Sequence, residues 1–340
     1  MAGNSVKGGA SIQDQPINAM SLFSKTLISA ASLSSFLLLS ACGDQGGDAA
    51  SGESVTIPDE PSAAVETIAR ELAAANGGVL WQAMPATYQT DVNAIAQLAG
   101  SKVDAEVYDQ SFGLLGRLAD VADKQKEFVL NTELGGAQPE EQIARLEAAW
   151  PSIIGFVRTI SESPIANSAG LQAFDGQEFF NGTVSELLGH SEAMSALSDE
   201  AMSLASLKEV VVKTLESSEN AATLEMTAPD GTTETEAFTK VDERWVPTEM
   251  AVGWQETIAN ARGQLEAITP EQTAQSKPQI MQVVAMLDGV LTQIEAAQTQ
   301  EQFDQALQGA MMPLMGLMMM QQGMGGGQPA APTMPMPSQP

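Results

Sequence analysis

The chain of 340 residues contains a single cysteine, Cys42. No disulfide can therefore form within the chain, and the burial of apolar side chains must provide its stability. Hydrophobic residues make up 44% of the sequence, which is normal for a folded protein. The segment 61–320 is long enough to bury the core of one or two domains.

The residues before Cys42 have the layout of a signal peptide. Lys25 precedes an apolar segment, Leu27–Leu39, and small residues separate that segment from Cys42. A positive start, a short apolar middle and a cleavage point with small residues are typical of such peptides. The apolar segment is shorter than the roughly 20 residues of a membrane-spanning helix. The sequence therefore predicts cleavage close to Cys42.

The tetrapeptide Leu39-Ser40-Ala41-Cys42 resembles the lipobox of bacterial lipoproteins, and residues 20–42 carry the whole resemblance. In these proteins the cysteine receives a diacylglycerol on its sulfur and becomes the mature N-terminus. The resemblance implies two or three acyl chains, such as palmitate, on Cys42. They would give a stable anchor, because each buried methylene contributes about 0.8 kcal/mol. The alternative interpretation is an ordinary secretory signal with a cysteine near its end by chance.

The residue after the lipobox cysteine bears on the location of the protein. In enteric-type lipoproteins an aspartate at this position marks retention in the inner membrane, whereas this chain has Gly43. The resemblance therefore implies the outer membrane, with the protein facing the periplasm. Residues 42–60, rich in Gly, Ser and Asp, are expected to form a flexible tether between the lipid and the folded part.

The first 19 residues are too long and too polar for the front of a signal peptide. A start at Met20 gives a signal peptide of normal length, residues 20–41. We therefore expect translation to begin at Met20, which makes residues 1–19 a mis-assigned upstream extension.

Apolar residues at helical spacing predict a helical domain over 61–205. The longest pattern begins near Asp104 and sets five residues along one face: Val107, Leu114, Leu118, Val121 and Val129. Start and stop signals bound the other helices. Ser62 is a candidate N-cap, and Gly100 is expected to end a helix over Thr90–Leu98. Pro139 is expected to start a helix that Pro151 breaks or kinks. Asn181-Gly182 is expected to interrupt a helix over Leu171–Leu197.

The pattern changes in the part from 206 to 320. Clusters of β-branched residues over 209–250, with turn signals at Asp230-Gly231 and Asp242-Glu243, predict an antiparallel meander of three or four strands. Helical patterns follow, with start signals at Thr269-Pro270-Glu271 and Ser276 and a last helix over 301–320. Residues 321–340, rich in Gly, Pro and Met, are expected to be disordered. The predicted fold class is α+β and mostly α-helical.

The charge of the chain bears on its partners. It carries 15 basic and 43 acidic residues, a formal charge of −28. Such a surface repels nucleic acid, whose binding depends on phosphate neutralisation by Lys and Arg, so no nucleic-acid partner is expected. It also repels anionic headgroups, so membrane attachment must come from the lipid on Cys42.

The sequence contains no assembled catalytic motif. His190 is the only histidine, which excludes a zinc site built from several histidines. Neither a G-x-S-x-G elbow nor a phosphate-binding G-x-x-x-x-G-K-[ST] loop occurs. Glu234 and Glu236 would share one face of a strand, but solvated edge charges explain them better than a calcium site does. We assign no catalytic residue and no cofactor.

The aromatic residues are predicted to serve packing. The four tryptophans occur singly and are candidate core anchors: Trp81, Trp150, Trp245 and Trp254. The pair Phe179-Phe180 could line a groove, but a buried helix face is the favoured interpretation.

Methionines are concentrated near the end of the chain, where nine of the 18 lie between Met311 and Met336. Thioethers suit Cu(I), and M-x-x-M or M-x-M spacings place two sulfur atoms within reach of one ion. The candidate ligands are Met315, Met318, Met319, Met320 and Met324. Adaptable contact or helix packing is one alternative explanation, and low-complexity drift is another.

Taken together, these features favour a non-enzymatic binding or accessory module. We expect it to be anchored by lipid at the periplasmic face of the outer membrane and to act through contact with an envelope protein. The alternatives are copper(I) handling by the Met-rich end, and a small-ligand-binding lipoprotein with a pocket between sheet and helices.

Overall fold

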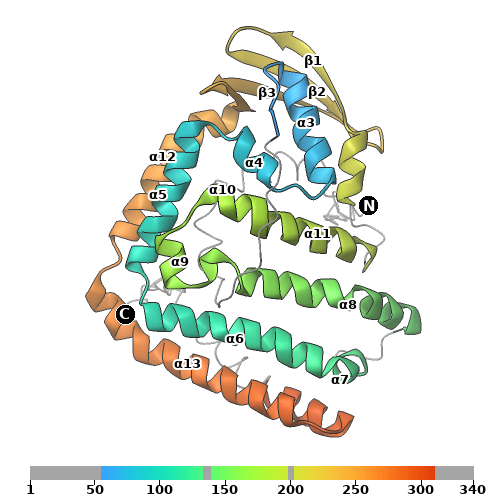
Figure 1. Cartoon of the computed structure of the whole chain (residues 1–340), viewed down its shortest axis with the longest axis vertical. Coiled ribbons are helices and arrows are strands. Elements are labelled where there is room, and N and C mark those ends of the chain that lie inside the picture. Colours follow the sequence, from blue (N-terminus) through green and yellow to red (C-terminus); the bar gives the residue numbers. More distant parts are fainter. Residues whose placement is uncertain (1–54, 133–138, 198–202, 311–340) are drawn as a thin grey trace, which may run out of the picture.

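The structure is a computed structural model that describes residues 55–132, 139–197 and 203–310. Figure 1 shows a small sheet at one end of the molecule and helices along the rest of it. Two helices run from the sheet along one side, α5 (Ala86–Lys102) and α12 (Thr248–Glu266), and three lie across the lower part, α6 (Ala105–Lys124), α8 (Glu140–Ser161) and α13 (Pro270–Ala296). The chain is α+β and mostly helical, as the sequence predicts.

Helix α3 (Pro61–Ala73) confirms the first predicted helix but has a different N-cap. The Glu60 carboxylate accepts a hydrogen bond from the Ala63 backbone N–H at 2.7 Å. The predicted cap, Ser62, lies inside the helix and donates its hydroxyl to the same carboxylate. Pro61 follows the cap directly, at the first helical position, where its fixed φ favours a helix. The helix α4 (Gly78–Ala83) comes next.

Helix α5 continues to Lys102, so the prediction that Gly100 ends a helix is wrong. A Cβ atom at Gly100 would lie 2.6 Å from the backbone nitrogen of Gln172, in α9 (Ser168–Gln172). The glycine is required because two helix backbones approach each other closely at this position.

Helix α6 begins after Asp104, whose carboxylate caps it by accepting the Val107 N–H at 3.1 Å. This start confirms the prediction, but one member of the predicted face is wrong, because Leu118 is 46% exposed. Phe112, Ala119 and Val121 are the buried residues of α6. The short helix α7 (Lys126–Leu130) follows it.

Helix α8 runs through Pro151, which was predicted to break or kink it. An internal proline costs a helix about 3 kcal/mol, because it removes one hydrogen bond and crowds the preceding turn. Trp150 and Ile154, on either side of Pro151, are both buried in one cluster with Ala119 of α6. This burial on both sides holds the helix together through the proline.

The predicted interruption at Asn181-Gly182 is a π-helical turn. The turn η2 (Phe180–Val184) joins α10 (Gly176–Phe179) to α11 (Ser185–Met194), so the chain winds on without a break there. Short 3₁₀ turns occur before and after this stretch: η1 (Pro164–Ala166), η3 (Ser195–Leu197) and η4 (Leu204–Glu209).

The sheet is a four-stranded antiparallel meander in sequence order, formed by β1 (Val211–Ser217), β2 (Ala221–Thr227), β3 (Thr233–Val241) and β4 (Arg244–Pro247). Both predicted turns are confirmed. Gly231 has φ 84°, and Asp242 and Glu243 have φ 45° and 60°, the positive values of a tight hairpin turn. Helix α3 packs its Ala64 and Val65 on one face of the sheet, which we call the inner face.

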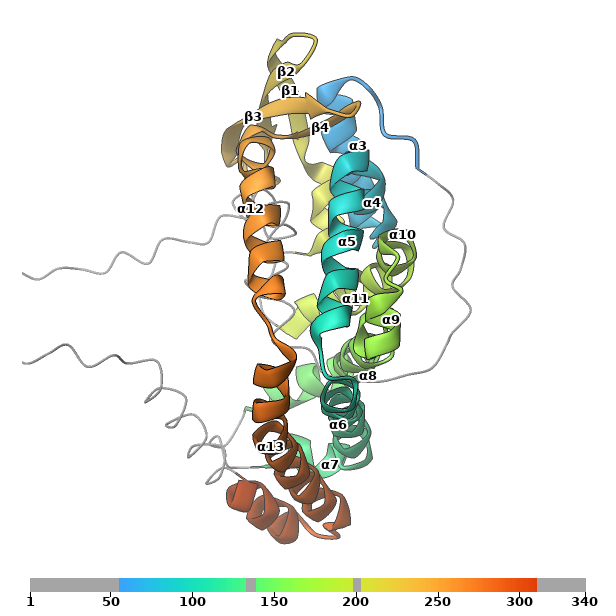
Figure 2. The ribbon, with the colours of Figure 1, turned by 90° about the vertical axis from the view of Figure 1, so that its left-hand side faces the viewer.

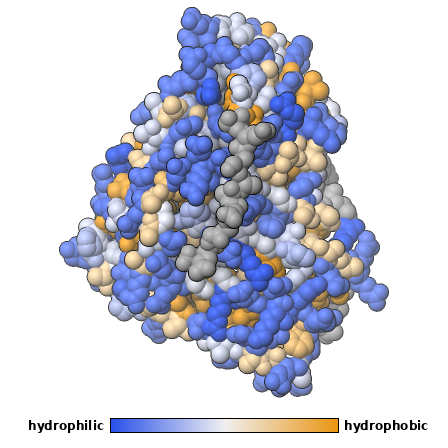
Figure 3. Space-filling model, viewed as in Figure 1, coloured by the Kyte–Doolittle hydropathy of each residue, from blue (hydrophilic) through white to orange (hydrophobic). Residues whose placement is uncertain are grey.

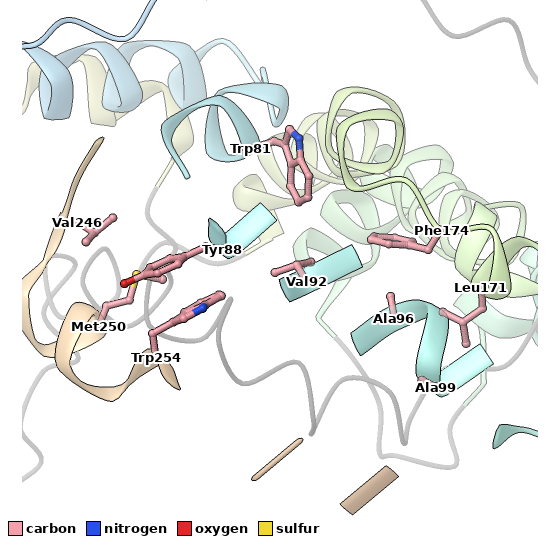
Figure 4. Close-up of a cluster of buried hydrophobic side chains, with 10 residues drawn as sticks. All are labelled: Trp81, Tyr88, Val92, Ala96, Ala99, Leu171, Phe174, Val246, Met250 and Trp254. Carbon is pink, nitrogen blue, oxygen red and sulfur yellow. The ribbon is translucent and has the colours of Figure 1, made fainter. Parts of the chain in front are cut away.

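A second cluster joins the sheet end to the helices (Figure 4). It contains residues of α4 and α5 and residues that follow β3, so parts of the chain before and after position 205 share one core. Tyr88 stacks on Trp254 of α12 with a centroid distance of 3.9 Å and an interplanar angle of 8°. The Trp254 indole N–H donates to the Asp91 carboxylate at 2.9 Å.

Helices α12 and α13 form a bent rod beside α5 and α6, as Figure 2 shows. The predicted start of α13 is confirmed, because Thr269 and Gln272 form a capping box there. Ser276 starts no helix and lies within α13. The last predicted helix begins at residue 300 and is described as far as 310.

Polar contacts join α13 to α6. Arg117 of α6 pairs with Asp288 and, at 3.4 Å, with Glu295. The Lys277 ammonium lies 3.0 Å from an Asp104 carboxylate oxygen, at the other end of the contact. Leu291 is the buried residue of α13. Ion pairs at both ends therefore fix how α13 lies along α6.

Candidate functional site

Two of the predicted sites lie outside the described residues. They are the lipidation site Cys42 and the candidate copper ligands Met315, Met318, Met319, Met320 and Met324. Among the described residues, no group of three or more His, Cys, Asp or Glu side chains is placed to hold a metal ion. No helix in that part of the chain combines the length and the apolar character needed to cross a membrane.

His190, the only histidine, lies on α11 and is half-buried. Its imidazole packs on Gly155 of α8, where an added Cβ atom would lie 2.3 Å from Cε1 of the ring. No hydrogen bond or ion pair of the His190 side chain occurs within the described ranges. The contact with Gly155 is therefore one of packing between two helices.

Glu234 and Glu236 do share one face of a strand, as predicted, but they are not fully solvated edge charges. Both are half-buried and lie on the inner face of β3, beside the buried Phe238. In the register with β2 they stand opposite the core residues Met226 and Leu224. The alternation of side chains along a strand forces this placement once Phe238 enters the core.

The tryptophans pack in the core, as predicted, whereas Phe179 and Phe180 are half-buried and pack against it. The four tryptophans are at most 8% exposed. Phe179 and Phe180 belong to a run of ring contacts with Phe174 and Trp81, at centroid distances of 5.4 to 5.7 Å. These rings fill the space between α4, α9 and α10.

The first strand of the sheet presents apolar side chains to solvent. Val211 is 61% exposed and Leu215 is 44% exposed. Strand β1 pairs with β2 on one side, and no described strand pairs with its other side. The face of the molecule that Figure 3 shows carries mostly hydrophilic residues with small, scattered apolar groups. We call Val211–Ser217 the β1 edge.

A cavity of about 250 Å³ lies where α12 bends into α13, and we call it the elbow pocket. Its walls come from α5, α6, α9 and α12 and from the two connections that follow α5 and α12. Eight of its ten lining residues are apolar or aromatic: Ile95, Ala99, Val103, Tyr108, Leu171, Ala261, Leu265 and Ile268. The other two are Lys102 and Gln264.

A second, more polar hollow of about 390 Å³ adjoins the elbow pocket and shares Lys102, Val103 and Ile268 with it. Asp104 and Thr273 belong to its polar wall. The backbone N–H of Val107, and then the ammonium of Lys277, hold the pKa of Asp104 below its usual value. We call this second hollow the polar mouth of the elbow pocket, because the two share three lining residues.

Comparisons with family models, with curated proteins and with solved structures found no match to this chain. The class that its own residues define is an α+β protein with a four-stranded meander at one end and a helical body. Within the described residues, the β1 edge and the elbow pocket are two features whose apolar residues are open to a partner or a ligand.

Proposed function

We propose that this protein is a lipid-anchored envelope protein of the outer membrane that faces the periplasm and acts as a non-enzymatic binding or accessory module. Its anchor is the lipid on Cys42, for which the tetrapeptide Leu39-Ser40-Ala41-Cys42 is the support. Its binding surface is the β1 edge, which takes up an extended segment of an envelope protein.

The observation that carries the binding role is the exposure of Val211 and Leu215 on a strand with one unpaired side. An open strand edge offers backbone N–H and C=O groups that an added strand can pair with. Alternating side chains of the edge strand then contact the added segment and provide specificity. The β1 edge therefore offers unpaired backbone groups for affinity and exposed apolar side chains for specificity.

Cross-linking in intact cells, followed by detergent extraction and pull-down of the lipidated protein, tests the proposal. We expect one dominant envelope protein in near-equal amount. Recovery of the chain alone, with cross-linking otherwise efficient, would contradict the role in protein contact.

The double substitution Val211→Asp/Leu215→Asp should reduce the recovered partner by about tenfold or more, because it places two carboxylates against an apolar contact. The matched control is Val252→Asp on α12, since Val252 is 80% exposed and lies away from β1. Quantitative mass spectrometry of the pull-down measures the amount of partner recovered with the double variant and with the control. Equal loss in the control and the double variant would exclude the β1 edge as the contact surface.

A further inference from the structure

We propose that the elbow pocket binds a medium-chain fatty acid, with its acyl chain between α5 and α12 and its carboxylate at Lys102. The inference is independent of the β1 edge, because it concerns a different part of the molecule and a different kind of ligand. It rests on the lining of the pocket, its volume and the charges at its mouth.

The interior of the pocket suits an unbranched apolar chain. Ala99 of α5 and Ala261 of α12 both line the pocket, and their small side chains leave space that larger residues would fill. Leu171 closes the pocket from α9 and is 1% exposed. Pockets with apolar walls and a few polar groups at one end are typical of sites for small amphiphilic ligands.

The volume sets the length of the chain. A water molecule takes about 30 Å³ of the liquid, and a methylene group is of about the same size. The cavity of about 250 Å³ therefore holds about eight carbons. A ten-carbon acid fills it and keeps its carboxylate in the polar mouth.

The charges at the mouth favour an anionic head. Asp104 is already paired with Lys277, whose ammonium also lies 2.8 Å from Glu106. Lys102 forms no ion pair with any described residue, although acidic residues far outnumber basic ones and the chain has a formal charge of −28. Of the charged side chains that line the two hollows, Lys102 is the cation left to receive a carboxylate.

Isothermal titration calorimetry with decanoate tests the inference, on the chain from Gly43 onward, which retains every residue of the described fold. Decyltrimethylammonium serves as a second probe with the same tail and the opposite charge. The variants are Lys102→Glu and Ala261→Phe, and the control is Lys208→Glu. Lys208 is an exposed lysine of η4 without an ion pair among the described residues, and its reversal changes the net charge equally.

We expect decanoate to bind more tightly than about 1 mM and to bind more tightly than the cation. Lys102→Glu should weaken its binding by about tenfold or more, whereas Lys208→Glu should leave it unchanged. Ala261→Phe should abolish binding by filling the pocket. If Ala261→Phe does not fold, the comparison of Lys102→Glu with Lys208→Glu is sufficient to test the inference. Equal affinity in both lysine variants, tighter binding of the cation, or no binding of decanoate would overturn the inference.

Discussion

The variant Gly100→Ala will have a free energy of unfolding lower by about 2–3 kcal/mol, because added core volume forces the backbone to shift. The new Cβ atom would lie 2.6 Å from the Gln172 nitrogen and 2.8 Å from the Leu171 carbonyl carbon. Both atoms belong to the backbone of α9, so rotation of a side chain cannot relieve the clash. Urea unfolding followed by circular dichroism measures the change.

The matched control is Gly113→Ala in α6. A Cβ atom at Gly113 meets nothing within 4 Å, so the better helix propensity of alanine should stabilise this variant by about 0.5–1 kcal/mol. The free energy of unfolding should therefore fall in Gly100→Ala and rise in Gly113→Ala. This difference in sign distinguishes the effect of close packing from that of helix propensity. A more stable Gly100→Ala variant would show that α5 and α9 do not approach as described.

The variant Cys42→Ser will leave the membrane fraction and appear as soluble protein. The two or three acyl chains proposed on Cys42 would bury tens of methylene groups, each of which contributes about 0.8 kcal/mol, whereas serine offers no attachment point. Fractionation of cells followed by immunoblotting measures the shift. The acidic surface, with a formal charge of −28, supplies no other affinity for anionic lipid.

Gly43→Asp provides the control for this experiment. It keeps the lipobox cysteine, and the lipoprotein resemblance implies that it stays in the membrane fraction while moving from the outer to the inner membrane. Retention of Cys42→Ser in the membrane would mean that another part of the chain anchors the protein.

The sequence predicts the elements of this fold where the signal is local. The β-branched clusters and the turns at Asp230-Gly231 and Asp242-Glu243 specify the meander, since strand alternation and positive φ are properties of a few neighbouring residues. The capping residues Asp104 and Thr269 likewise mark the starts of α6 and α13. Each of these signals acts within four or five residues.

The helix end predicted at Gly100 and the helix break predicted at Pro151 are wrong for a different reason, which is contact between distant parts of the chain. Gly100 has the chemistry of a helix end but allows α5 to touch α9. Pro151 should disrupt a helix, yet the buried Trp150 and Ile154 hold α8 together around it. Neither outcome can be found in the neighbouring sequence, because the partner residues lie elsewhere in the chain.

The candidate sites differ in the same way: one depends on neighbouring residues and the other on contacts between distant residues. The exposed Val211 and Leu215 follow from the first strand of a predicted meander, where one side has no neighbour in sequence order. The elbow pocket is lined by residues that lie far apart in the sequence, such as Ala99 of α5 and Ala261 of α12. Lys102 gave no signal in the sequence, since a lysine in the last turn of a helix is common. Its lack of an ion pair is visible only in three dimensions.

The measurement that tests the central claim most directly is mass spectrometry of the N-terminal peptide of the protein purified from membranes. The account predicts a peptide that begins at Cys42 and carries a diacylglyceryl group on the sulfur. A peptide that contains Cys42 as an unmodified thiol, or that begins upstream of it, would contradict the lipid anchor and the location derived from it.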